Sequence, residues 1–177
     1  MQKDQRPEVW LRGPLSDIPA LLQPAAHAIL QAEEEITALA TEFPNELLWE
    51  KPAGVASVGF HLQHLAGVLD RLFTYAREEQ LSDNQLNYLR NEGKEPFPGC
   101  TLQDLLDYFR SQIRQALNQF RRTDEYTLTQ VRYVGRAKIP STHIGLLFHA
   151  AEHTQRHLGQ LLVTARILQA GSKNPDF

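Results

Sequence analysis

The sequence is poor in residues that can cross-link a chain. It contains a single cysteine, Cys100, among 177 residues, which excludes an internal disulfide and suits a reducing compartment. Cys100 directly precedes Thr101, a predicted helix N-cap, and a helix N-terminus favours the thiolate form. A lone thiol after Pro98-Gly99 is more often incidental, so we assign it no chemistry. The cysteine content therefore predicts a cytoplasmic protein.

Long apolar runs and an excess of positive charge are also absent. Nowhere do eighteen uncharged apolar residues follow one another, and residues 1–7 lack the apolar stretch of a secretory signal, so we expect no membrane segment and no membrane partner. The formal net charge is −3, which argues against a nucleic-acid partner. The pair Arg121-Arg122 is too short to change this and fits the cationic end of a helix. A small molecule is the partner that we expect.

The chain is large enough to form one domain, residues 1–177, with its own core. Hydrophobic residues make up 42% of the 177 positions, which is enough to fold without disulfides or a structural metal. A metal bound to this protein is therefore free to take part in chemistry. No internal repeat, linker or low-complexity tract divides the chain.

Helical periodicity accounts for most of the sequence, and strand patterns are nearly missing. Apolar residues recur at helical spacing in four long segments, which are residues 16–43, 58–80, 101–122 and 141–170. Pro19 and Pro24 indicate that the regular part of the first segment begins late. A shorter helix is expected over residues 82–92, closed by Gly93. These patterns predict an all-α protein.

Capping residues and breakers fix how the helices are connected. The predicted N-caps are Ser57, Ser82, Thr101 and Ser141, of which Ser82 and Thr101 begin capping boxes. Residues 126–140 form a long connection, rich in β-branched residues, that is expected to contain a little extended structure. Four long amphipathic helices without regular βαβ alternation predict an antiparallel four-helix bundle with a short extra helix and a long connection before the last helix.

Five of the seven histidines fall in two short segments. His149, His153 and His157 follow one another at steps of four residues inside the last predicted helix. His61 and His64 lie in the second long helix. Side chains four apart on a helix lie about 5–6 Å from one another, so neighbouring imidazoles can converge on one ion. The pattern is typical of a metal site assembled from two packed helices.

Helical phase ranks these histidines by their distance from the core. On the last helix His153 and His157 border the apolar face, whereas His149 turns towards the polar side and is expected to support the site or line a cavity. On the second helix His61 lies in the middle of the apolar arc and His64 at its edge. Phase does not choose between these two, because a central histidine can be a hydrogen-bonded core residue and an edge histidine can face a cavity.

The sequence excludes two known kinds of helical metal site. Di-iron bundles use Glu-x-x-His on two helices, and this motif is absent. The His-Glu-x-x-His motif is absent too, because Glu152 precedes His153 and is expected to point away from the metal face. Three imidazoles without a carboxylate ligand predict a mononuclear site with an open position for water or substrate. Imidazole suits zinc, nickel and copper, so the identity of the ion stays open.

Two segments resemble the DinB/YfiT superfamily of metalloenzymes. One is residues 57–67, containing His-Leu-Gln-His-Leu-Ala, and the other is residues 149–160, containing His-x-x-x-His-x-Gly-Gln. The resemblance covers most of the chain and implies a four-helix bundle that binds a divalent ion, often zinc or nickel. The implied ligands are His64, His153 and His157. It also implies a metal-dependent hydrolase or a transferase of a low-molecular-weight thiol, and a homodimer.

The leading hypothesis is that the protein is an enzyme. Its metal ion would lower the pKa of bound water towards about 7, or would bind a thiol cofactor as thiolate. The residues expected to orient ligands or move a proton around the site are Gln160, Glu152, His61 and His149. The alternative is a metal-stabilised binding or stress-response module without turnover. A fourth ligand from His61 or His149 would close the site and make it structural. A haem- or lipid-carrying bundle is less favoured, because the pattern contains no broad apolar groove.

Overall fold

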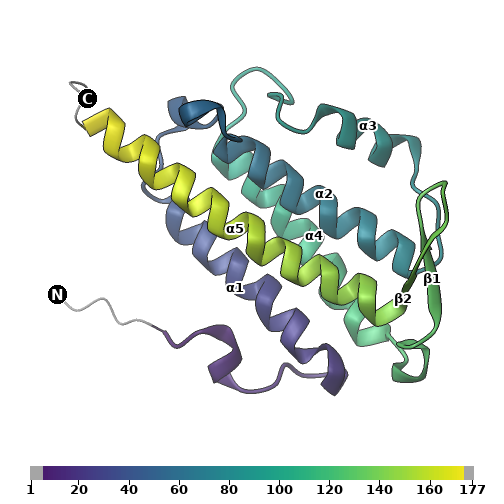
Figure 1. Ribbon diagram of the computed structural model, residues 1–177. Helices are drawn as coiled ribbons and strands as arrows, with labels where there is room; N and C mark the ends of the chain where they lie inside the picture. Colours follow the sequence, from purple (N-terminus) through teal and green to yellow (C-terminus); the bar gives the residue numbers. More distant parts are fainter. Residues whose placement is uncertain (1–5, 174–177) are drawn as a thin grey trace.

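The computed structural model describes residues 6–173, and most of them are helical (Figure 1). Within these residues four long helices carry the fold: α1 (Gln23–Ala40), α2 (Val58–Ala76), α4 (Leu102–Arg122) and α5 (His143–Lys173). The shorter elements include α3 (Asp83–Asn91), several 3-10 turns and two antiparallel strands, β1 (Val131–Val134) and β2 (Ile139–Thr142). The predicted helical fold is confirmed, and the extended structure expected in the long connection is a small two-stranded sheet.

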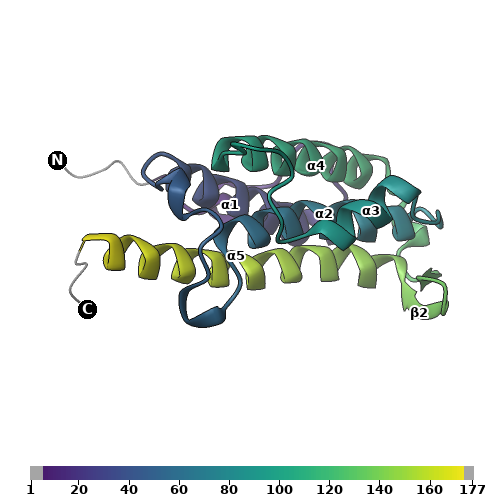
Figure 2. The same ribbon diagram turned by 90° about the horizontal axis from the view of Figure 1, so that it is seen from above.

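The long helices pack in pairs that are distant in the sequence. The main contacts join α2 to α5 and α4, and α1 to the same two helices, so α4 and α5 lie on opposite sides of α1 and α2 (Figure 2). Gln155 on α5 donates to the carbonyl of Ala28, and Gln169, further along α5, donates to the carbonyl of Glu42. Both partners advance along the chain together, so α1 and α5 run in the same direction. The colours in Figure 1 show α2 and α4 running the opposite way. The histidine-bearing helices α2 and α5 are therefore antiparallel neighbours.

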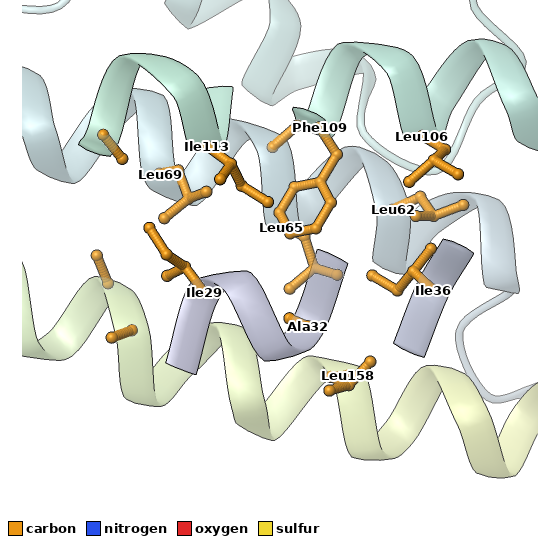
Figure 3. Close-up of a cluster of buried hydrophobic side chains, with 14 of the residues drawn as sticks. Ile29, Ala32, Ile36, Leu62, Leu65, Leu69, Leu106, Phe109, Ile113 and Leu158 are labelled. Carbon is orange, nitrogen blue, oxygen red and sulfur yellow. The ribbon is translucent and has the colours of Figure 1, made fainter. Parts of the chain in front are cut away.

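The core between these helices consists of aliphatic and aromatic side chains (Figure 3). The largest fully buried members include Ile29, Ile36, Leu62, Leu65, Leu69, Leu106, Phe109 and Ile113. They recur at steps of three and four residues, as the amphipathic pattern predicts. Leu158 and Leu161 contribute from α5. This packing fixes the relative position of α2 and α5 and hence of the polar side chains between them.

Three of the predicted N-caps are confirmed. The Ser57 hydroxyl accepts a hydrogen bond from a backbone N–H in the first turn of α2. Ser82 with Gln85 and Thr101 with Asp104 form complete capping boxes at the starts of α3 and α4. Each satisfies backbone donors that a helix leaves free at its first turn. These helices therefore begin where the local sequence predicts.

The predicted N-cap of the last helix, Ser141, is wrong by one residue. Ser141 lies in β2, and α5 begins at His143. The hydroxyl of Thr142 accepts a hydrogen bond from the Gly145 N–H at 3.0 Å, in the manner of an N-cap. Pairing of β2 with β1 holds Ser141 in an extended backbone, so the capping position moves to the next residue.

Helix α2 ends at Ala76, earlier than the predicted residue 80. Arg132 from β1 is buried, and its Nε donates to the carbonyl oxygen of Ala76 at 2.9 Å. Glu78 has a φ of 64°, a left-handed conformation that an α-helix cannot continue. The β-hairpin therefore terminates α2 by taking up one of its last carbonyls.

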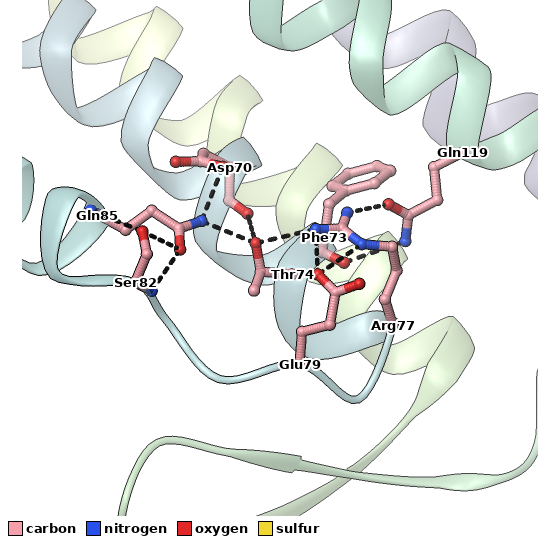
Figure 4. Close-up of polar contacts among 8 residues, drawn as sticks. All are labelled: Asp70, Phe73, Thr74, Arg77, Glu79, Ser82, Gln85 and Gln119. Carbon is pink, nitrogen blue, oxygen red and sulfur yellow. Dashed lines mark hydrogen bonds and ion pairs between the residues drawn. The ribbon is translucent and has the colours of Figure 1, made fainter.

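Polar contacts fasten the start of α3 to α2 (Figure 4). The amide of Gln85 donates to Asp70 Oδ1 at 2.9 Å and to Thr74 Oγ1 at 2.8 Å, while its Oε1 accepts the backbone N–H of Ser82 at 2.8 Å. One glutamine thus completes the cap of α3 and docks α3 on α2. This places the end of α3 beside the middle of α2.

Candidate metal centre

Three histidines from α2 and α5 converge on one point. Ring nitrogens of His64, His153 and His157 lie within 4.8 Å of one another, and Nε2 of His64 is 3.0 Å from Nε2 of His153. The ring centroid of His157 lies 4.4 Å from that of His64 and 4.5 Å from that of His153. We call these residues the triad. They are the three that the family resemblance implies, and as a group they could hold a metal ion.

The packing of α2 against α5 positions the triad. His153 and His157 lie on consecutive turns of α5, so they share a face of that helix. His64 lies on the antiparallel helix α2, next to the fully buried Leu65. Leu158, which follows His157 in the chain, is buried as well. The triad therefore borders the core on one side and is half-buried.

A carboxylate that the sequence analysis missed holds His64. His64 Nδ1 is 2.7 Å from Glu92 Oε2, and Arg71 Nη1 donates to Glu92 Oε1 at 2.6 Å. Burial opposes ionisation of Glu92, but the hydrogen bonds and charges of His64 and Arg71 outweigh it, so its pKa lies below the ordinary value. An ionised Glu92 accepts the Nδ1–H of His64. The lone pair of Nε2 is then directed away from Glu92, towards the triad.

The turn after α3 places Glu92, the C-cap of that helix. Gly93 N–H donates to Gln63 Oε1 at 2.7 Å, and Gln63 Nε2 donates to the carbonyl of Lys94 at 2.9 Å. Gly93 has a φ of 88°, which favours glycine. A Cβ at this position would lie 3.2 Å from the Phe60 ring. The predicted closing glycine therefore also lets the turn approach α2.

Gly67 leaves the space that the Arg71–Glu92 pair occupies. A Cβ on Gly67 would lie 2.5 Å from both Arg71 Nη1 and Glu92 Oε1. The Tyr88 hydroxyl donates to the carbonyl of Gln63 at 3.0 Å, which fixes the last turn of α3 over the same part of α2. A larger residue at position 67 would push apart the side chains that hold His64.

His61 supports His157 from the core side. It is buried, and its Nδ1 lies 3.1 Å from Nδ1 of His157, so one ring donates and the other accepts. Burial, with the nearby His64, lowers the pKa of His61 to about 4, and burial with the neighbouring histidines lowers that of His157 to about 4. Burial also lowers the pKa of His153. These rings are therefore neutral at neutral pH, the state in which imidazole binds a metal.

The remaining predicted site residues lie on the outer side of α5. His149 Nδ1 is 2.6 Å from Glu152 Oε1, and Arg156 Nη2 is 3.1 Å from Glu152 Oε2. The His149 ring centroid is 5.2 Å from that of His153. Gln160 is exposed and has no hydrogen bond to any residue in the described part of the chain. His149 and Glu152 thus adjoin the triad through His153, whereas Gln160 is free in solvent.

The single cysteine is not activated. Cys100 is buried, and burial raises the pKa of its thiol to about 11. The acidic residues Asp104 and Glu95 act in the same direction. The thiolate that a helix N-terminus could favour is therefore not the form present at neutral pH.

Two cavities lie away from the triad. One, of about 650 Å³, lies where α2 and α4 end and is lined by Arg77, Arg132 and His143 among others. The other, of about 610 Å³, lies between the N-terminal segment and α1 and includes Trp10 and His27 in its wall. Neither contains a residue of the triad. The triad is therefore a half-buried surface site between α2 and α5.

We expect the metal-free protein to lose stability as the pH falls from about 6.5 to about 4. Histidines of the unfolded chain take up protons in this range, whereas His61 and His157 do so only near its lower end. The stability that depends on neutral His61 and His157 is therefore fully present above the unfolded pKa of about 6.5 and is lost as the pH falls towards their folded pKa of about 4. Urea midpoints measured across this range test the expectation, and the decline should be shallower in His61→Asn. Parallel curves for both proteins would contradict it.

No helix within the described residues combines the length and the apolar content that a membrane span needs. None of the curated proteins compared with this chain matches it significantly. The crystal structure of a conserved protein from Enterococcus faecalis superposes with a TM-score of 0.65, covering 84% of this chain and 97% of its own at 17% identity. At that identity the likeness shows the fold alone.

Comparison with models of protein families shows to which family the chain belongs. The model of the DinB superfamily matches residues 28–161, a span that includes His64, His153 and His157. The match covers well over half of the sequence. The chain therefore belongs to the DinB superfamily.

Proposed function

We propose that this protein is a divalent-metal-dependent enzyme with a mononuclear centre made by His64, His153 and His157. The reaction is of the hydrolase type or is the transfer of a low-molecular-weight thiol, with a small molecule as substrate. The observation that carries the proposal is the convergence of three imidazoles, with Nδ1 of His64 held by Glu92 so that its Nε2 faces the other two rings. An imidazole donor set suits zinc or nickel. When bound, the ion would supply Lewis-acid activation of water or of a thiol.

The other residues near the triad orient its ligands. Glu92 fixes which nitrogen of His64 carries the proton, and Arg71 keeps Glu92 ionised. His61 fixes the ring of His157 in the same way. Second partners of this kind typically change metal affinity by about 10–100-fold when they are removed. Because imidazole binds a metal in its neutral form, a centre with three imidazole ligands would retain the full charge of the ion for a substrate or nucleophile.

The alternative function is a metal-stabilised binding or stress-response module without turnover. Such a site would be closed by a fourth protein ligand. The two further imidazoles, His61 and His149, hydrogen-bond to His157 and Glu152, which supports an open position and favours the enzyme. We also propose that residues 1–177 form one four-helix-bundle domain. The low cysteine content supports a cytoplasmic location, and the family resemblance supports a homodimer.

Metal analysis tests the proposed centre. Protein purified without an affinity tag should contain about one zinc or nickel ion per chain. His64→Ala, His153→Ala and His157→Ala should each lose most of it, because two imidazoles bind a divalent ion far more weakly than three. His27→Ala, which changes a histidine of α1 outside the triad, is the control and should keep the ion. Equal metal content in all the proteins would remove the proposed centre.

Chelation separates the enzyme from the structural alternative. Removing the ion should lower the melting temperature by less than about 5 °C, because the core and not the metal provides most of the folding free energy. Differential scanning calorimetry before and after dialysis against a chelator measures the shift. A much larger drop, or unfolding of the metal-free protein, would favour the structural module.

A further inference from the structure

The three triad histidines differ in how firmly they are held. His64 Nδ1 is bound to Glu92, and His157 Nδ1 is bound to His61. His153 Nδ1 is buried and has no hydrogen-bond partner among residues 6–173. A metal-ligating histidine usually has its second nitrogen fixed by another group. His153 is therefore the triad residue whose ring is least tied to one orientation.

His153 also belongs to a second group of ligand-type side chains. Ligand atoms of His149, Glu152 and His153 lie within 4.8 Å of one another. The His149 side chain is 50% exposed, whereas that of His64 is 18% exposed. Two imidazoles and a carboxylate are a suitable donor set for a divalent ion. The second group thus offers ligands on the solvent side of the triad, with one residue in common.

We propose that His149, Glu152 and His153 form an outer capture site through which a divalent cation enters the triad. The inference rests on the proposed metal centre. Two dications sharing the ring of His153 would repel each other strongly, so the two groups are occupied in succession and one ion per chain results. Glu152 supplies a negative charge that the triad lacks, which raises the local concentration of cations. His153 is the ligand that remains bound as the ion moves from His149 and Glu152 towards the other two histidines.

Arg156 opposes capture. Its guanidinium lies 3.1 Å from Glu152 Oε2 and neutralises the carboxylate that attracts the ion. Arg156 is exposed, and pairs of this kind on a helix surface are weak, so an arriving dication can displace it. Removing this positive charge should therefore make uptake faster.

The rate of Co²⁺ uptake by the metal-free full-length chain, followed by stopped-flow absorbance, tests the capture site. We expect His149→Ala and Glu152→Gln to slow uptake about tenfold, at the low end of electrostatic effects on association. The final content should stay at about one Co²⁺ per chain, as for a mononuclear site. Arg156→Gln should accelerate uptake. Asp107→Asn is the matched control, since Asp107 is an exposed carboxylate paired with Arg110 on α4, and its rate should equal that of wild type.

Wild-type rates in both His149→Ala and Glu152→Gln would overturn the capture site while leaving the metal centre intact. An unchanged rate with a lower final Co²⁺ content would also overturn it, because the two residues would then be permanent ligands. Failure of the wild-type chain to take up Co²⁺ would remove the metal centre and the capture site together. Circular dichroism melting curves verify that each variant is folded.

Discussion

Replacement of Glu92 by alanine should lower the free energy of unfolding by about 3–5 kcal/mol, the usual cost of removing one partner from a buried ion pair. The variant leaves Arg71, whose side chain is 11% exposed, without its carboxylate. It also releases the Nδ1 of His64, so metal affinity should fall about 10–100-fold. Urea unfolding of the metal-free protein and competition with a chelator measure the two effects separately.

Glu79→Ala is the matched control for this prediction. Glu79 also pairs with an arginine, Arg77, but its side chain is 54% exposed, and exposed pairs contribute at most about 1 kcal/mol. This variant should bind metal as the wild type does. Equal losses of stability in the two variants would show that the buried carboxylate has no special role.

Phe109→Ala should destabilise the protein by about 3–5 kcal/mol, through lost burial and the cavity it leaves. Phe109 projects from α4 into the core and is fully buried (Figure 3). The metal content of the folded fraction should not change, because Phe109 contacts the core and not the triad. Phe148→Ala, at a position that is 60% exposed on α5, should cost less than about 1 kcal/mol. A loss of stability below about 1 kcal/mol in Phe109→Ala would contradict the packing described above.

Features encoded by neighbouring residues could be predicted from the sequence. The caps at Ser57, Ser82 and Thr101 depend on contacts within a single turn, and the sequence contains both partners. Helical spacing likewise predicts that His153 and His157 share a face. The family resemblance implies that His64 joins them, and the structure brings the three rings together.

Features made by contacts between distant segments could not be predicted. Glu92 lies 28 residues from His64, and their contact requires α3 to dock on α2. Gly93 and the capping box at Ser82 predict where α3 begins and ends, which places Glu92 at its last turn, but not which helix α3 meets. The early end of α2 has the same origin, because Arg132 from the hairpin binds its last turn.

Contacts between α2 and α5 also decide which of His61 and His64 joins the triad. Both lie on the side of α2 that meets α5, so phase gave no basis for a choice. His61 meets the Nδ1 of His157, whereas His64 meets the Nε2 of His153. The central histidine therefore supports a ligand-type ring from the core, and the edge histidine is the one that joins the triad.

Crystals of the metal-loaded protein, with anomalous diffraction recorded at the absorption edge of the bound ion, test the central claim most directly. We predict one anomalous peak per chain, about 2.0–2.1 Å from a ring nitrogen of each of His64, His153 and His157. A peak bound to other residues, or no peak between α2 and α5, would contradict the claim that these three imidazoles share one cation.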